Sequence, residues 1–167
     1  MHYAREAELD EVDVHIVMLL QDNARLTMRA LGAEVGLSGP AVTERVRRLE
    51  ERGVLRAYRA EVPPERVGLP VVAFVSLGMA YDVRPSNRLE ADVRGIEAIV
   101  ECYRITGEDA YLLKVAVPDM EALRETLDRL GDYGRARTSV VLSVPKPPTP
   151  LRPQQARSGP PFRHGAD

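Results

Sequence analysis

The chain has 167 residues, 44% of them hydrophobic, which suffices for one large domain or two small domains with packed cores. Its formal net charge of −2 excludes a polycation, so any nucleic-acid contact must use a local basic surface. A lone cysteine, Cys102, excludes an internal disulfide and a multi-cysteine metal site. The N-terminus lacks the apolar core of a signal peptide, and the apolar run 71–81 is shorter than the ~20 residues of a membrane span. A cytoplasmic protein without membrane contact is expected.

Three short helices are predicted in the first 53 residues. Asp10, Thr27 and Ser38 are each placed to act as an N-cap. The first helix ends near residue 22, and the second stops at Gly36. Two helices joined across the short link 36–38, the second rich in arginine, are typical of a helix-turn-helix that reads a DNA groove.

The third helix is predicted to bury one apolar stripe and to expose its charged faces. The stripe is Val42, Val46 and Leu49, at i, i+4 and i+7, and Gly53 suits the left-handed conformation after the helix. Residues 45–59 contain six arginines against two glutamates, a local balance of 6 − 2 = +4.

This charge pattern predicts contacts to double-stranded DNA. Amides at the helix start can bind a phosphate, arginines can bind phosphates or guanine, and the methyl of Thr43 can meet a thymine methyl. Glu44 can accept from cytosine, although a salt bridge to Arg48 at i+4 is the favoured interpretation. The predicted DNA-binding residues are Ser38, Gly39, Pro40, Thr43, Glu44, Arg45, Arg47, Arg48 and Arg52.

After the third helix, residues 54–60 alternate roughly as a short strand, which predicts a wing. Residues 61–70 contain three prolines and a glycine and are interpreted as a linker. The domain boundaries predicted are therefore 1–60 for the helix-turn-helix domain, 61–70 for the linker and 71–145 for a second domain. Residues 146–167, rich in Pro, Gly, Gln and Arg, are predicted to be a disordered tail.

The second domain is predicted to alternate strands and helices in the order β-α-β-β-α-β. Strands are expected over 71–80, 99–106, 111–117 and 137–144, with one helix between 85 and 94 and another capped by Asp119. This order predicts an α+β, ferredoxin-like fold. The first strand is apolar on both faces, so one face is expected to be covered by a second subunit in a two-fold dimer.

The residues as a whole resemble the Lrp/AsnC (feast/famine) transcriptional regulators from about Leu9 to Pro145. The stretches that carry the resemblance are Leu9–Asp13, Val35–Ser38, Arg45–Glu50, Gly53–Leu55, Glu101–Tyr103, Thr106–Gly107, Tyr111–Val115, Val117–Met120 and Arg137–Val141.

This resemblance implies an N-terminal winged helix-turn-helix domain and a C-terminal ferredoxin-like domain for sensing and oligomerisation. It implies homodimers that build higher oligomers such as octamers, no cofactor, and a small-molecule effector, commonly an amino acid, held between subunits. The effector residues that it implies are Thr106, Gly107, Glu108, Asp109, Ala110, Thr138 and Ser139. Ala110 is a departure, because many amino-acid-binding members have an aspartate there; the effector is left open between an amino acid, another ligand and none.

Two other functions compete with a regulator. A sirohaem-decarboxylase-like enzyme on the same architecture is disfavoured, because His2, His15 and His164 form no cluster near the effector residues 106–110. A storage or scaffolding oligomer with an inert helix-turn-helix is disfavoured by the complete arginine set. The sequence therefore favours a DNA-binding regulator that is not an enzyme.

Overall fold

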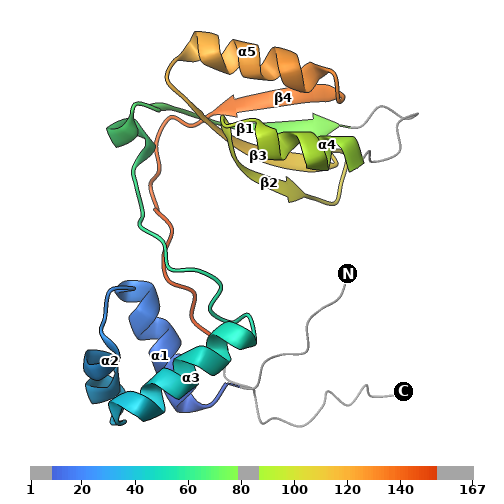
Figure 1. Ribbon diagram of the computed structural model, residues 1–167. Helices are drawn as coiled ribbons and strands as arrows, with labels where there is room; N and C mark the ends of the chain where they lie inside the picture. The colour runs from blue at the N-terminus through green and yellow to red at the C-terminus, as the bar shows by residue number, and fades with distance from the viewer. Residues whose placement is uncertain (1–8, 79–86, 154–167) are drawn as a thin grey trace, which may run out of the picture. The chain divides into compact units, whose positions relative to one another are not determined.

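The structure is a computed structural model that describes residues 9–78 and 87–153 (Figure 1). The chain divides into two compact units, one of residues up to 60 together with those from 148 onward, the other of residues 61–147. We describe each unit separately as the helical unit and the sheet unit. Within the described residues, no helix has the length and apolar character needed to cross a membrane.

The helical unit contains the three predicted helices: α1 (Glu11–Asp22), α2 (Met28–Val35) and α3 (Gly39–Glu51). Each predicted N-cap is confirmed. The side chains of Asp10, Thr27 and Ser38 accept hydrogen bonds from the amides of Asp13, Ala30 and Ala41, respectively. Because an N-cap satisfies a donor within its own chain segment, these starts depend on local sequence alone.

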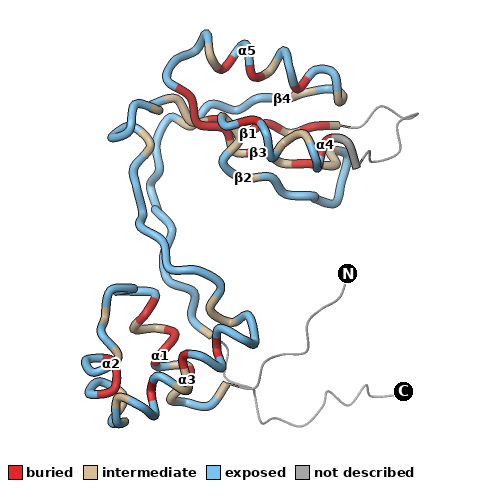
Figure 2. The backbone as a smooth tube through the Cα atoms, viewed as in Figure 1, coloured by how far each residue is buried: buried red, intermediate tan, exposed pale blue. Residues whose placement is uncertain are grey.

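The core of the helical unit forms where the three helices face one another (Figure 2). The predicted stripe of α3, Val42, Val46 and Leu49, is buried, with at most 5% of each residue exposed. The other fully or nearly fully buried members of the core are Ile16, Val17, Leu20 and Leu31. This packing leaves the opposite side of α3, with its charged residues, in solvent.

The strand predicted over 54–60 is absent, and this part of the wing prediction is wrong. The amides of Val54 and Leu55 donate to the carbonyl of Leu49 at 2.9 and 3.1 Å and close the end of α3. Both side chains pack against the helical core. Gly53, at φ 69°, provides the left-handed turn that brings them there. These two residues therefore complete the core, and residues 56–60 form no ladder with the described part of the chain.

The sheet unit confirms the predicted ferredoxin-like order. Its elements are η1 (Pro64–Val67), β1 (Val71–Gly78), α4 (Asn87–Asp92), η2 (Val93–Gly95), β2 (Ile99–Arg104), β3 (Tyr111–Val117), α5 (Met120–Gly131) and β4 (Arg135–Val140). The four strands pair antiparallel in the order β2-β3-β1-β4. Helices α4 and α5 lie on the same face of this sheet (Figure 1).

The bounds of two strands differ from the prediction. β4 begins two residues earlier and ends at Val140 instead of residue 144, because its partner β1 begins at Val71 and the last bond joins Val141 to Val72. β2 ends at Arg104 instead of residue 106. Residues 79–86, which contain the predicted end of β1 and the predicted start of the next helix, lie outside the described residues.

The two faces of the sheet have different surroundings. Ala73, Val75 and Leu77 of β1 are fully buried beneath the helices, beside the inward residues of β3. The register places Phe74 on the other face with Leu112 and Tyr103. Phe74 and Tyr103 are 38% and 50% exposed. We call this surface the open face; it carries large apolar side chains, as the sequence predicts.

The beginning of the predicted tail contacts the helical unit. The side-chain amide of Gln21 donates to the carbonyl of Leu151 at 2.8 Å and accepts from the Leu151 amide at 2.7 Å. Residues 151–153 also line a groove of about 860 Å³ with residues 54–57. Residues 148–153 thus have a defined place in the helical unit, whereas residues 154–167 lie outside the described part.

Candidate nucleic-acid interface and effector loop

The exposed side of α3 begins at its N-cap. Ser38 and Pro40 are exposed and Gly39 is half-buried, so the start of the helix faces solvent as predicted. The hydroxyl of Thr43 donates to the carbonyl of Gly39 at 2.8 Å, which uses its polar group within the helix. Its methyl group is the part of Thr43 that remains for an apolar contact.

The arginines of α3 are paired with glutamates on the same helix. Glu44 accepts from Arg47 in bidentate geometry, with N···O distances of 2.9 and 2.7 Å, and from Nε of Arg48 at 3.0 Å. Arg47 also donates to Glu51. The predicted Glu44–Arg48 salt bridge is therefore confirmed. The four side chains are about half exposed and their charges cancel.

These pairs shift the protonation equilibria of the exposed side of α3. Hydrogen bonds from Arg47 and Arg48 lower the pKa of Glu44 to about 2. The bond with Glu44 raises the pKa of Arg47. Both partners therefore keep their charges across the physiological pH range. An approaching phosphate or base must compete with Glu44 for the two guanidinium groups, since each group has a limited set of donors.

Arg45 points away from this group and toward α1. Its Nη1 donates to Asp10 at 2.6 Å and to Asp13 at 2.8 Å, and its side chain is 31% exposed. Arg52, at the end of α3, is exposed, and its backbone amide donates to the carbonyl of Arg48 at 2.9 Å. The structure thus brings Arg47 and Arg48 together with Glu44 and places Arg45 elsewhere.

The predicted effector loop joins β2 to β3. Gly107 has φ 122°, a conformation that favours glycine, at the turn of this loop. Arg137 of β4 pairs with Asp109, and lies 3.8 Å from a carboxylate oxygen of Glu108. The bond with Asp109 raises the pKa of Arg137. Asp109, 15% exposed, is close to Gly78, where an added Cβ would lie 3.3 Å from its Oδ1.

The other predicted effector residues are not gathered in one place. Thr106 is exposed beside Gly107, whereas Ala110 is half-buried and its amide donates to the carbonyl of Leu77 at 2.9 Å. Thr138 pairs with Val75 and Ser139 with Phe74, so the two adjacent residues face opposite sides of the sheet. Within this chain, a small molecule on one side of β4 can contact only one of them.

Three charged residues at these sites were missed from the sequence. Asp10 and Asp13 were assigned to the start of α1, with no partner on α3, and Arg137 was outside the effector set. The partners of Arg45 are 32 and 35 residues away along the chain, and those of Arg137 are 28 and 29. Such pairs have no sequence periodicity, so no pattern within one element reveals them.

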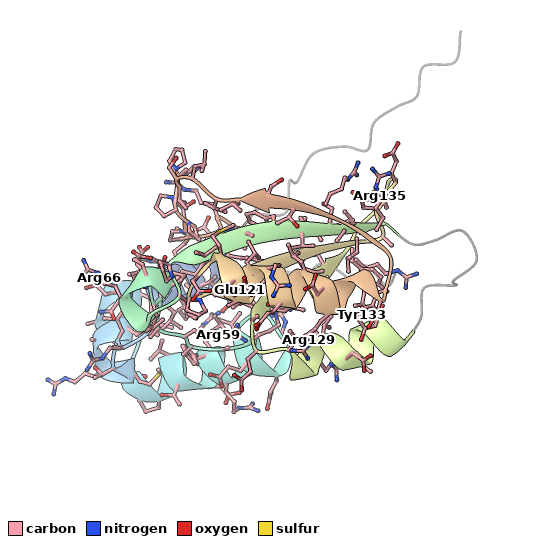
Figure 3. The ribbon with its side chains drawn as sticks, turned by 90° about the horizontal axis from the view of Figure 1, so that it is seen from above. Arg59, Arg66, Glu121, Arg129, Tyr133 and Arg135 are labelled. Carbon is pink, nitrogen blue, oxygen red and sulfur yellow. The ribbon has the colours of Figure 1, made fainter. Side chains whose placement is uncertain are left out.

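One more hollow, of about 440 Å³, lies in the sheet unit between α4 and the end of α5. Arg129 and Tyr133 line it (Figure 3), and the phenol of Tyr133 donates to Asp92. It contains none of the predicted effector residues. Among the described residues, no group of three or more His, Cys, Asp or Glu side chains is arranged to hold a metal ion.

A three-helix unit with an exposed arginine-bearing third helix, followed by a ferredoxin-like unit, defines a helix-turn-helix transcriptional regulator. Residues 9–50 match the AsnC-type helix-turn-helix domain, and residues 72–151 match the Lrp/AsnC ligand binding domain. The chain belongs to the Lrp/AsnC family, and its function is that of a DNA-binding transcriptional regulator of this type.

Relatives with this architecture align with most of the chain. The HTH-type transcriptional regulator LrpC of Bacillus subtilis is 35% identical over 136 residues, covering 81% of this chain and 93% of that protein. The leucine-responsive regulatory protein of Escherichia coli is 37% identical over 146 residues, covering 83% of this chain and 88% of that protein. The solved structure of a feast or famine regulatory protein from M. tuberculosis, complexed with L-methionine, has a TM-score of 0.81 at 35% identity. The match covers 87% of this chain and 99% of that protein. The sirohaem-decarboxylase alternative receives no support from these comparisons.

Proposed function

We propose that this regulator binds double-stranded DNA through the exposed side of α3. The observation that carries the proposal is the burial of Val42, Val46 and Leu49, which turns Arg47 and Arg48 outward behind a solvent-exposed helix start. Ser38, Gly39 and Pro40 are then placed to approach a phosphate, and Thr43 and Arg52 to contact the groove or its backbone, while Glu44 orients Arg47 and Arg48. Residues 1–60 act as the reading domain.

A mobility shift on the DNA upstream of the regulator's own gene tests this proposal. We expect a shift at low salt that weakens steeply as salt increases, because each neutralised phosphate releases counterions. Arg47→Ala is expected to reduce affinity by about 1–3 kcal/mol if Arg47 contacts a base. The absence of any shift at low salt, with upstream DNA of the adjacent gene also tested, would contradict DNA binding.

The sheet unit is proposed to form the dimer and to hold a small effector. The open face is apolar enough to require a cover, and a second copy of the same sheet is the symmetric choice. The effector would lie between subunits near Thr106–Ala110, with Ser139 or Thr138 supplied from β4, and the dimers would assemble further, up to octamers. An amino acid is the proposed class of effector, supported by the relative that is complexed with L-methionine.

Light scattering with and without L-methionine and other amino acids tests effector binding. A ligand bound between subunits is expected to change the assembly size or the DNA affinity, because binding at one site alters the equilibrium at the other. Unchanged size and unchanged DNA affinity with every amino acid would contradict an amino-acid effector. We further propose that the protein has no enzymatic activity and acts in the cytoplasm, as expected for a bacterial regulator.

A further inference from the structure

Arg45 differs from Arg47 and Arg48 in where its bonds go. The bonds of Arg47 and Arg48 end on glutamates of α3 itself, so they cannot fix that helix relative to another element. The bonds of Arg45 end on α1. Among the described residues, Arg45 makes the ion pairs that the structure records between α1 and α3.

Three hydrogen bonds join Arg45, Asp10 and Asp13. A single nitrogen, Nη1 of Arg45, bridges Oδ2 of Asp10 and Oδ1 of Asp13. The other oxygen of Asp10 accepts from the Asp13 amide at 2.8 Å as the N-cap of α1. The Asp13 side chain is 12% exposed, so its charge depends on Arg45 for compensation.

This contact limits how α3 can turn. The apolar stripe holds α3 against α1 and α2, but apolar burial has no direction and permits small rotations about the helix axis. Charge-assisted hydrogen bonds are directional and short. Since Arg45 lies in the middle of α3, holding its guanidinium at the N-terminus of α1 restricts the small rotations of α3 that the buried stripe still allows.

We propose that Arg45 is a positioning residue, which orients α3 for reading DNA through Asp10 and Asp13 and makes no DNA contact of its own. This inference rests on the proposed DNA-binding function. The proposed role distinguishes Arg45 from Arg47 and Arg48, although the sequence alone placed all three among the DNA-binding residues.

The test measures affinity for the upstream duplex across a series of salt concentrations, in the full-length chain. The variants are Arg45→Gln, Asp13→Asn and their combination, with Arg47→Gln as the matched control. Arg45→Gln is expected to lower the affinity for DNA roughly threefold to tenfold, a size typical of the coupling between residues in contact. The slope of log affinity against log salt concentration should not change, because no phosphate contact is lost. Arg47→Gln is expected to reduce that slope by about 1 if Arg47 contacts a phosphate.

The aspartate variant distinguishes positioning from direct contact. Asp13→Asn removes a negative charge, which by electrostatics alone would strengthen DNA binding. Positioning predicts the opposite, a loss of affinity, and the combined variant should then bind no more weakly than Arg45→Gln alone. A reduced salt slope for Arg45→Gln, or tighter binding by Asp13→Asn, would overturn the inference while leaving the proposed function intact.

Folding is monitored by far-UV circular dichroism, and affinities are compared below the unfolding temperature of every variant. Asp10→Asn provides a milder change if the others unfold, because asparagine keeps the N-cap oxygen but loses the charge. It should weaken DNA binding with an unchanged salt slope; stronger binding would overturn the inference. A wild-type chain that fails to bind any duplex would overturn both the inference and the function on which it rests.

Discussion

At the scale of single residues, Glu44 determines how the arginines of α3 are presented. It holds Arg47 and Arg48 at once, and these bonds lower its pKa from 4.5 to about 2. A lowered pKa means that the pairing stabilises the folded state above pH 4.5 and is lost as the pH falls toward 2. Near neutral pH Glu44 is fully ionised, so it both orients the guanidinium groups and repels phosphates.

Glu44→Gln is therefore expected to strengthen binding to any duplex and to reduce discrimination between duplexes. We expect affinity for a scrambled duplex to rise roughly threefold to tenfold, as two guanidinium groups become available for phosphates. Fluorescence anisotropy with the upstream and scrambled duplexes measures both quantities. The control is Glu121→Gln, which removes an exposed acid paired with Arg124 in the sheet unit. Weaker binding to both duplexes would instead indicate that Glu44 contacts DNA directly.

At the scale of elements, the link between α2 and α3 depends on Gly32. The amide of Leu37 donates to the carbonyl of Gly32 at 2.8 Å and ends α2. A Cβ on residue 32 would lie 2.6 Å from the carbonyl oxygen of Leu37, which is backbone and cannot rotate away. Gly36, at φ 69°, completes the turn in a left-handed conformation. The close approach of the two helices thus requires the missing side chain of Gly32.

Gly32→Ala is expected to destabilise the helical unit by about 1–3 kcal/mol, because the turn must move to accept the methyl group. Urea unfolding followed by far-UV circular dichroism measures the loss. Gly39→Ala is the matched control, since a Cβ there meets nothing within 4 Å. An alanine at position 32 that stabilised the protein, as helix propensity alone predicts, would show that the turn adjusts freely.

At the scale of the whole molecule, the open face of the sheet unit suggests self-association. Phe74 lies at its centre in the register, and the Lys114–Glu101 pair, at 3.1 Å, lies on the same face. The pKa of Glu101 is lowered, mainly because the phenol of Tyr103 donates a hydrogen bond to its carboxylate. An exposed apolar patch bordered by a satisfied polar group is typical of a protein interface.

If the proposed dimer forms through the open face, Phe74→Glu is expected to leave the protein monomeric at micromolar concentration, because a buried, unpaired carboxylate costs several kcal/mol. Light scattering measures the mass, and circular dichroism checks that the fold is kept. Met120→Glu, a 59% exposed position at the start of α5, should leave at least the dimer intact. A Phe74→Glu protein of unchanged mass would place the dimer interface elsewhere.

Prediction from the sequence succeeded where the cause of a structure is local. Asp10, Thr27, Ser38 and Asp119 were identified as N-caps because the amide that each one bonds lies three residues ahead. Prediction failed where a segment's structure depends on residues that are distant along the chain. The end of β4 is set by where β1 begins, and residues 54–55 are drawn into the helical core instead of pairing as a strand.

The sequence by itself determined the three helices, the β-α-β-β-α-β order, the buried stripe of α3 and the resemblance to the Lrp/AsnC family. Periodicity and capping encode these features within a few residues of chain. Only the tertiary structure decided which charges far apart in the chain are paired: Arg45 with Asp10 and Asp13, and Arg137 with Asp109. An ion pair forms wherever folding brings opposite charges together, and separation along the chain does not constrain that meeting.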